Sequence, residues 1–197
     1  MIFRLALAAT LALTATSPAF AHLDPAEHGS FAAGFSHPLF GTDHVLAMIA
    51  VGLWAALLCG RAVLALPTAF VSAMIAGFGL ALAGFPLPYV EPLILTSVIV
   101  LGLVVALALR LPLPASAAFV ALFGICHGYA HGGEMGAATE FGYAAGFVLA
   151  TALLHATGLL IGYSASISAR NDPARATRII RGLGALMALG GIYLAAA

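Results

Sequence analysis

Long apolar runs, separated by short polar or proline-containing breaks, dominate the chain. Six apolar segments follow a polar stretch that ends near Ser30; they lie near residues 35–58, 62–84, 91–109, 115–131, 141–166 and 178–196. A helix rises about 1.5 Å per residue, so most of these segments can cross a hydrocarbon core of about 30 Å. The fourth is the shortest. The pattern predicts an all-α membrane protein built as a six-helix transmembrane bundle.

The amino-acid composition supports a lipid environment. The 197 residues are 63% hydrophobic and 7% charged, with a mean hydropathy of +1.12, whereas a soluble domain carries roughly 25% charged residues. The formal net charge is zero, which argues against a nucleic-acid partner. The sequence has no GxxxxGKS or GxxxxGKT phosphate loop, so we expect no ATP hydrolysis.

The first 21 residues have the features of a secretory signal peptide. Arg4 provides a short positive region, residues 5–13 form an apolar core, and Ala19-Phe20-Ala21 matches a small-x-small cleavage site. We expect cleavage after Ala21, which leaves residues 22–197 as a single transmembrane domain. The alternative is a first helix that the mature protein retains.

The arginines lie at one end of the predicted spans, and most histidines and acids lie at the other. With the mature N-terminus outside, the cytoplasmic loops hold Arg61, Arg110, Arg170, Arg175, Arg178 and Arg181. On or near the outer side lie His22, His28, His37, His44, His127, His131, Asp24, Glu27, Asp43, Glu91, Glu134 and Glu140. This positive-inside pattern predicts a multi-pass protein of a bacterial inner membrane with both mature termini in the periplasm. Its outer end would attract divalent cations.

The two cysteines fall on opposite sides of the predicted membrane. Cys59 is at the inner end of the first span and Cys126 is near the outer end of the fourth. A disulfide needs Cα atoms within about 7 Å of each other. We therefore expect two free thiols.

Three ionisable residues occur in the outer half of the first span: His37, Asp43 and His44. Pro38 suits the first turn of a helix. If one helix runs through this segment, His37 and His44 are nearly two turns apart and share a face. Ionisable groups inside a span are costly and normally mark an ion path. We interpret the three as metal ligands; alternatively, His37 caps a helix end and Asp43 bonds nearby backbone.

A second polar group closes the fourth span. His127 and His131 are four residues apart, which places both on one helical face as ligands for one ion. Gly132 and Gly133 are expected to break the helix and let Glu134 fold back toward them. The alternative is a glycine-rich turn with exposed histidines.

Three further residues are candidate ligands. Glu91 opens the third span at the depth of the two polar groups, and His155 lies deep in the fifth span, where it could form a lower step. His22 would offer its α-amine and its imidazole to one ion after cleavage. Alternatively, Glu91 is a solvated acid, His155 is a core histidine and His22 belongs to a frayed terminus.

The ligand types restrict the metal. Imidazole and carboxylate groups without a thiolate cluster disfavour Cu(I), and the imidazoles disfavour Ca²⁺ and Mg²⁺. Ni²⁺, Co²⁺ and Zn²⁺ remain, and ligand type alone does not rank them.

Two sequence runs resemble a known family. The run His37-Pro38-x-x-Gly41-x-Asp43-His44-x-x-Ala47-Met48 looks like the signature of the HupE/UreJ proteins, which are hydrogenase- and urease-associated nickel permeases. The run His127-Gly128-x-Ala130-His131-Gly132-x-Glu134, the signal peptide and the six spans are similar to the same family. The resemblance covers essentially the whole mature chain. It implies a secondary Ni²⁺ permease, in some members one for Co²⁺, with functional positions at His37, Asp43, His44, His131 and Glu134.

We therefore expect a permease that moves Ni²⁺ or Co²⁺ from periplasm to cytoplasm for metalloenzyme maturation. The metal is cargo and no prosthetic group is expected; the recipients would be nickel metallochaperones or hydrogenase and urease maturation proteins. The alternative is a non-transporting metal sensor or accessory protein, which needs no ligand below Asp43. An intramembrane zinc enzyme is disfavoured because the sequence contains no HExxH.

Overall fold

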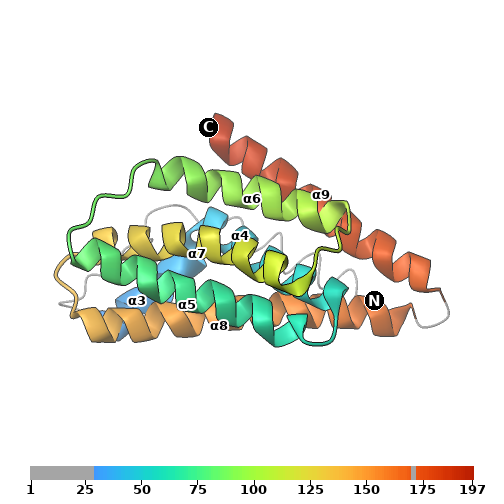
Figure 1. Cartoon of the computed structure of the whole chain (residues 1–197), viewed down its shortest axis with the longest axis horizontal. Helices are drawn as coiled ribbons and strands as arrows, with labels where there is room; N and C mark the ends of the chain where they lie inside the picture. Colours follow the sequence, from blue (N-terminus) through green and yellow to red (C-terminus); the bar gives the residue numbers. More distant parts are fainter. Residues whose placement is uncertain (1–28, 170–171) are drawn as a thin grey trace.

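The computed structural model describes residues 29–169 and 172–197, and this part of the chain is helical, without strands. Figure 1 shows the helices in chain order: α3 (Ser30–Phe40), α4 (Thr42–Leu58), α5 (Ala62–Leu82), α6 (Val90–Ala106), α7 (Leu113–Glu134), α8 (Glu140–Ser168) and α9 (Pro173–Ala196). The all-α prediction is confirmed. The expected signal peptide, His22 and Arg170 lie outside the described residues.

Not every predicted span is long enough to cross a membrane by itself. Within the described residues, α5, α7, α8 and α9 are long and apolar enough to do so, and α3 and α4 together are apolar enough for a fifth crossing as a bent pair, either as a broken span or as a re-entrant loop. Helix α6 is apolar but has 17 residues. Large apolar side chains such as Leu64, Leu122, Phe141 and Leu160 are exposed on the surface of the bundle, as lipid-facing residues are. The chain is thus a multi-pass membrane protein by helix length and composition.

The lengths of the third and fourth predicted segments are wrong for identifiable reasons. The third segment ends at Ala106 because the chain turns there: Ala108 has a positive φ of 50°. The carbonyl of Leu109 accepts a hydrogen bond from the Trp54 indole at 2.9 Å, which anchors the turn to α4. The fourth segment, expected to be the shortest, is the 22-residue helix α7 because it continues through its glycine pair to Glu134.

The first predicted span is broken at Gly41. Helices α3 and α4 meet there at 79°. A Cβ atom on Gly41 would lie 3.0 Å from Asp43 Oδ1 and 3.1 Å from His44 Nδ1, so glycine leaves room for these two side chains against the backbone. Asp43 lies in the first turn of α4, where a carboxylate is stabilised by the helix dipole.

Glycines let the other helices pack at close range. Along α7, Gly124, Gly128 and Gly132 recur every fourth residue and face the backbone of α5; a Cβ on Gly128 would overlap the Met74 carbonyl. Membrane helices commonly associate through such stripes of small residues. The prediction that Gly132 breaks the helix is therefore wrong: this glycine lets α7 lie against Ala81 on α5.

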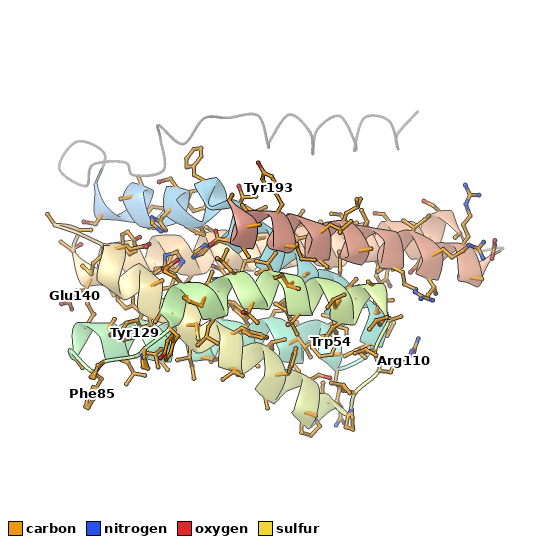
Figure 2. All side chains as sticks on the ribbon, turned by 90° about the horizontal axis from the view of Figure 1, so that it is seen from above. Trp54, Phe85, Arg110, Tyr129, Glu140 and Tyr193 are labelled. Atoms are coloured by element: carbon orange, nitrogen blue, oxygen red, sulfur yellow. The ribbon has the colours of Figure 1, made fainter. Side chains whose placement is uncertain are left out.

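Helix α8 packs against both α3 and α4, and α6 pairs with α9 along one side of the bundle (Figure 1). Arg110 lies at the end of the bundle opposite Glu140 and Tyr129 (Figure 2). The Arg181 side chain donates a hydrogen bond to the carbonyl of Ala106, at 2.7 Å. This contact ties the first half of α9 to the C-terminal end of α6. Both cysteines are free, as expected.

Candidate metal-binding site

Four histidine rings form a connected cluster inside the bundle. Ring centroids are 5.0 Å apart for His37 and His131, 4.9 Å for His44 and His131, and 4.8 Å for His44 and His127. His127 and His131 are fully buried, and His44 is 6% exposed. The structure thus brings together the imidazoles of both predicted motifs. We call His37, His44, His127 and His131 the histidine cluster.

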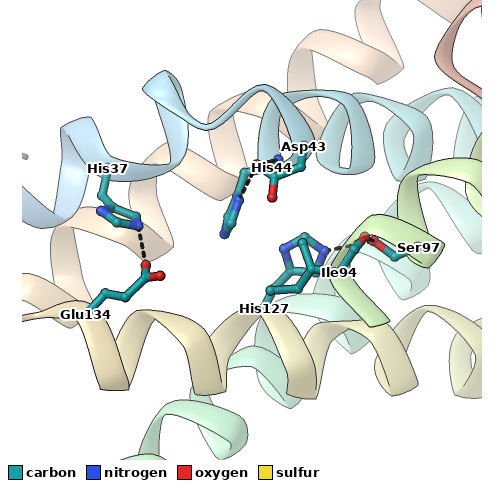
Figure 3. A network of polar contacts seen from close by, with 7 residues as sticks. All are labelled: His37, Asp43, His44, Ile94, Ser97, His127 and Glu134. Atoms are coloured by element: carbon teal, nitrogen blue, oxygen red, sulfur yellow. Dashed lines mark hydrogen bonds and ion pairs between the residues drawn. The ribbon is translucent and has the colours of Figure 1, made fainter. Parts of the chain in front are cut away.

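The helix break positions two members of this cluster. His37 comes from α3 and His44 from α4, so they do not share one helical face as expected. Their rings are nevertheless 6.1 Å apart, because the bend at Gly41 brings His44 back toward α3. Figure 3 shows both rings directed toward α7. His127 and His131 share one face of α7, as expected from their four-residue spacing. This face lies beside the glycine stripe that packs on α5.

Two carboxylates are bound to members of the cluster. His37 Nε2 lies 2.8 Å from Glu134 Oε2, and Figure 3 shows Glu134 reaching from the end of α7 toward α3. No fold-back of the chain is needed for this contact, because Glu134 is still helical. Asp43 Oδ1 accepts hydrogen bonds from His44 Nδ1 at 2.9 Å and from the His44 main-chain nitrogen at 2.8 Å.

The Asp43 contact determines which nitrogen of His44 is free to bind metal. An ionised carboxylate only accepts hydrogen bonds, so His44 Nδ1 carries the hydrogen and Nε2 carries the lone pair. Within the described residues, Nε2 is buried and has no hydrogen-bond partner. A carboxylate that fixes the tautomer of a histidine in this way is the usual support for a metal-binding imidazole.

Several other buried nitrogens in this part of the bundle share that condition. Within the described residues, partners are missing for His127 Nδ1 and for both ring nitrogens of His131 and His155. A buried polar group without a partner costs about 1–3 kcal/mol. Neutral imidazole nitrogens are the ligands that divalent Ni, Co and Zn accept. A bound cation would pair with these nitrogens and offset that cost.

The cluster is not a closed cage. Among residues 29–169 and 172–197, no three side chains of His, Cys, Asp or Glu are arranged around one point as metal ligands. The rings instead follow one another, from His37 through His131 and His44 to His127. This arrangement offers an ion successive pairs of ligands.

His155 lies outside the cluster, and one aromatic ring contacts both His155 and a member of the cluster. It is 1% exposed on α8. The Phe70 ring lies 5.2 Å from the ring of His155 and 5.5 Å from that of His127, measured between centroids. Phe70 therefore contacts both histidines, and the sequence gives no sign of this role because phenylalanine is ordinary in an apolar helix.

The remaining predicted ligands are peripheral. Glu91 is exposed in the first turn of α6 and lies near enough to Glu134 and Asp43 for their charges to interact. It therefore belongs to the acidic surroundings of the cluster. His22 lies outside the described residues, so its proposed chelation stays a prediction.

Besides Phe70, sequence reasoning missed three other polar or aromatic neighbours of the cluster. Tyr143 is 2% exposed, and its ring is 6.2 Å from His37 and 6.3 Å from His131. Phe147 stacks on His131 with ring centroids 4.8 Å apart. Ser97 Oγ lies 3.0 Å from His127 Nε2. The four-residue spacing of Tyr143 and Phe147 marks a shared face of α8, but Ser97 has no distinguishing signal.

Comparison with known proteins is consistent with this arrangement. The family model described as HupE / UreJ protein matches residues 9–194. Protein HupE from Rhizobium leguminosarum bv. viciae is 43% identical over 149 residues, which is 75% of this chain and 78% of that protein. No solved structure matches. The extent of both matches shows that the chain belongs to the HupE/UreJ family.

Proposed function

We propose that this protein is a secondary permease for Ni²⁺, with Co²⁺ as the second candidate cargo, that moves the ion from periplasm to cytoplasm across a bacterial inner membrane. One observation carries the proposal: the buried histidine cluster, whose rings lie 4.8 to 6.1 Å apart and include nitrogens without a protein partner among the described residues. Ionisable groups at such depth in a membrane bundle normally serve an ion.

The open arrangement of the cluster favours passage over storage. A structural or storage site holds its metal in a complete set of ligands. A conducting path instead needs binding that is strong enough to admit the ion and weak enough to release it. Successive imidazole pairs without a three-ligand cage among the described residues meet that requirement.

The path we propose begins among the acids at one end and continues past the cluster. Glu134, Glu91 and Asp43 concentrate the cation and replace part of its water shell. The ion then moves from His37 and His131 to His44 and His127, and continues past Phe70 to His155. Arg110 lies at the other end of the bundle from Glu140 (Figure 2), which orients the acidic end outward by the positive-inside rule.

The membrane potential is a sufficient driving force. Moving one charge through 100 mV gains about 2.3 kcal/mol, so a divalent cation gains about 4.6 kcal/mol on entry. The sequence has no nucleotide-binding lysine loop, which agrees with transport that does not use ATP. Because transport leaves the ion chemically unchanged, we propose no enzymatic reaction.

The family membership suggests the use of the metal. We propose that the ion supplies hydrogenase or urease, through nickel metallochaperones or other maturation proteins in the cytoplasm. The relative named protein HupE supports the placement in the family, and the use of the metal is inferred from that placement.

A metal-binding sensor or accessory protein is the second candidate function. The observation that favours it is the apolar Phe70 ring, which packs against both His127 and His155 where the proposed path would continue inward. A protein of this kind would bind nickel at the cluster and not release it inward.

The test is ⁶³Ni²⁺ accumulation by cells that express the wild-type chain, Asp43→Ala or His131→Ala, with Co²⁺ and Zn²⁺ as competitors. Asp172→Ala is the matched control, since this exposed acid pairs with Arg178 and lies outside the cluster. The permease predicts accumulation in wild-type and control cells and its loss in both cluster variants at equal membrane abundance. Nickel binding by purified protein without accumulation in cells would establish the sensor instead.

A further inference from the structure

Ser97 is a fully buried polar residue on α6, and it contacts one histidine of the neighbouring helix α7, His127. Its hydroxyl has two partners in the structure. Oγ lies 2.6 Å from the carbonyl oxygen of Ile94 and 3.0 Å from Nε2 of His127. Figure 3 shows Ser97 on one side of the His127 ring and His44 on the other.

The hydrogen positions at this contact follow from the chemistry of the three groups. A carbonyl oxygen only accepts, and the serine hydroxyl has one hydrogen to give. The shorter contact, to Ile94, therefore uses the Ser97 hydrogen. His127 Nε2 must then donate its own hydrogen to Ser97 Oγ, which makes His127 the Nε2–H tautomer.

This tautomer leaves the lone pair of His127 on Nδ1. Nδ1 is buried and has no hydrogen-bond partner within the described part of the chain. The same reasoning at Asp43 leaves the lone pair of His44 on Nε2, which is also buried and unpartnered there. The two rings lie 4.8 Å apart at 89°. Opposite tautomers thus supply one unprotonated nitrogen from each ring at the same step of the cluster.

We propose that Ser97 is a positioning residue for metal transfer: it holds His127 in the Nε2–H tautomer so that Nδ1 is the nitrogen that receives the ion from His44. The consequence for uptake rests on the proposed permease function, whereas the tautomer and the metal affinity of the purified protein do not. Ser97 does for His127 what Asp43 does for His44, with a neutral hydroxyl in place of a carboxylate. Outer-sphere partners of this kind usually change metal affinity by about 10–100-fold when removed.

A purely structural role would look different. A buried serine in a helix often bonds only to a carbonyl of the preceding turn. Ser116, which is also fully buried, has one side-chain hydrogen bond among the described residues, to the carbonyl of Leu111 just before α7, at 3.4 Å. Ser97 has the histidine contact in addition. Ser116→Ala is therefore the matched control for Ser97→Ala.

The first measurement needs no serine variant. Purified full-length protein with ¹⁵N-labelled histidine, in lipid nanodiscs and without metal, is examined by NMR for histidine tautomers, and His127→Ala identifies the His127 signals. We expect a neutral ring with hydrogen on Nε2. Hydrogen on Nδ1 of His127 in the wild-type protein would overturn the proposal.

The second measurement compares serine variants by the same NMR signals and by Ni²⁺ titration of the purified protein. We expect Ser97→Ala to give mixed His127 tautomers and about tenfold weaker Ni²⁺ binding, and Ser116→Ala to change neither. Ser97→Thr keeps the hydroxyl and should keep the tautomer. In a His127→Ala background, Ser97→Ala should have no further effect on affinity.

An unchanged tautomer in Ser97→Ala, or an equal loss of affinity with and without His127, would contradict the proposal. If wild-type cells accumulate no nickel, the permease function fails, but both measurements on purified protein still decide the role of Ser97.

Discussion

One carboxylate oxygen of Asp43 accepts two hydrogen bonds from His44, from its ring Nδ1 at 2.9 Å and from its main-chain nitrogen at 2.8 Å. The ring orientation of His44 therefore depends on the residue directly before it. The two side chains are fixed at the first turn of α4. The helix break at Gly41 and the candidate metal ligand His44 are therefore parts of one local structure.

Replacing Asp43 should weaken metal binding without unfolding the bundle. Asp43→Ala frees the His44 ring to rotate and to change tautomer, so we expect Ni²⁺ affinity to fall by about 10–100-fold. Asp43→Asn can still accept a hydrogen bond through its amide oxygen and should lose less. Calorimetric titration of purified protein with Ni²⁺ measures both. Equal losses in the two variants would show that the charge of Asp43, and not its hydrogen bond, matters.

Gly41→Ala should disrupt the same local structure from the backbone side. The added Cβ would lie 3.0 Å from Asp43 Oδ1 and 3.1 Å from His44 Nδ1, so one of these side chains must move. We expect ⁶³Ni²⁺ uptake to fall while membrane abundance stays normal. Gly79→Ala is the control, because a Cβ there meets nothing within 4 Å. Full uptake by Gly41→Ala would mean that transport tolerates displacement of the Asp43 and His44 side chains.

The helical periodicity was enough to predict part of the site. His127 and His131 are four residues apart on a helix that forms as expected, so their common face follows from 3.6 residues per turn. The apolar segments likewise predicted an all-helical chain. Both results depend on local sequence alone.

The break in the first span could not be predicted in this way. Gly41 and Gly52 belong to the same apolar segment, yet the helix ends at Gly41 and continues through Gly52, which packs against Gly158 on α8. The apolar pattern does not encode the neighbours of either glycine, which are the Asp43 and His44 side chains for Gly41 and the backbone of α8 for Gly52. Phe70 and Ser97 were missed for the same reason, since their histidine neighbours come from other helices.

Gly128→Ala should destabilise the bundle itself. The Cβ would overlap the carbonyl of Met74 on α5, so α5 and α7 must separate. Overpacking in a core costs about 1–3 kcal/mol, and a backbone neighbour cannot swing aside as a side chain can. We expect a lower unfolding temperature in detergent. Gly182→Ala, with nothing within 4 Å of its Cβ, should not lower it; equal unfolding temperatures for both variants would refute the close approach of α5 and α7.

His155→Phe should separate metal binding from metal release. The ring nitrogens of His155 are buried and unpartnered among the described residues, and the Phe70 ring contacts both His155 and His127 of the cluster. Phenylalanine fills the same space without a ligand, so the cluster should still bind Ni²⁺ in purified protein. If His155 is the inner step of the path, ⁶³Ni²⁺ uptake should fall by about tenfold, which corresponds to a transport barrier about 1.4 kcal/mol higher. The ratio of uptake to affinity, compared between wild type and variant, is the informative quantity. A normal ratio would assign His155 to core packing and would end the proposed path at His127.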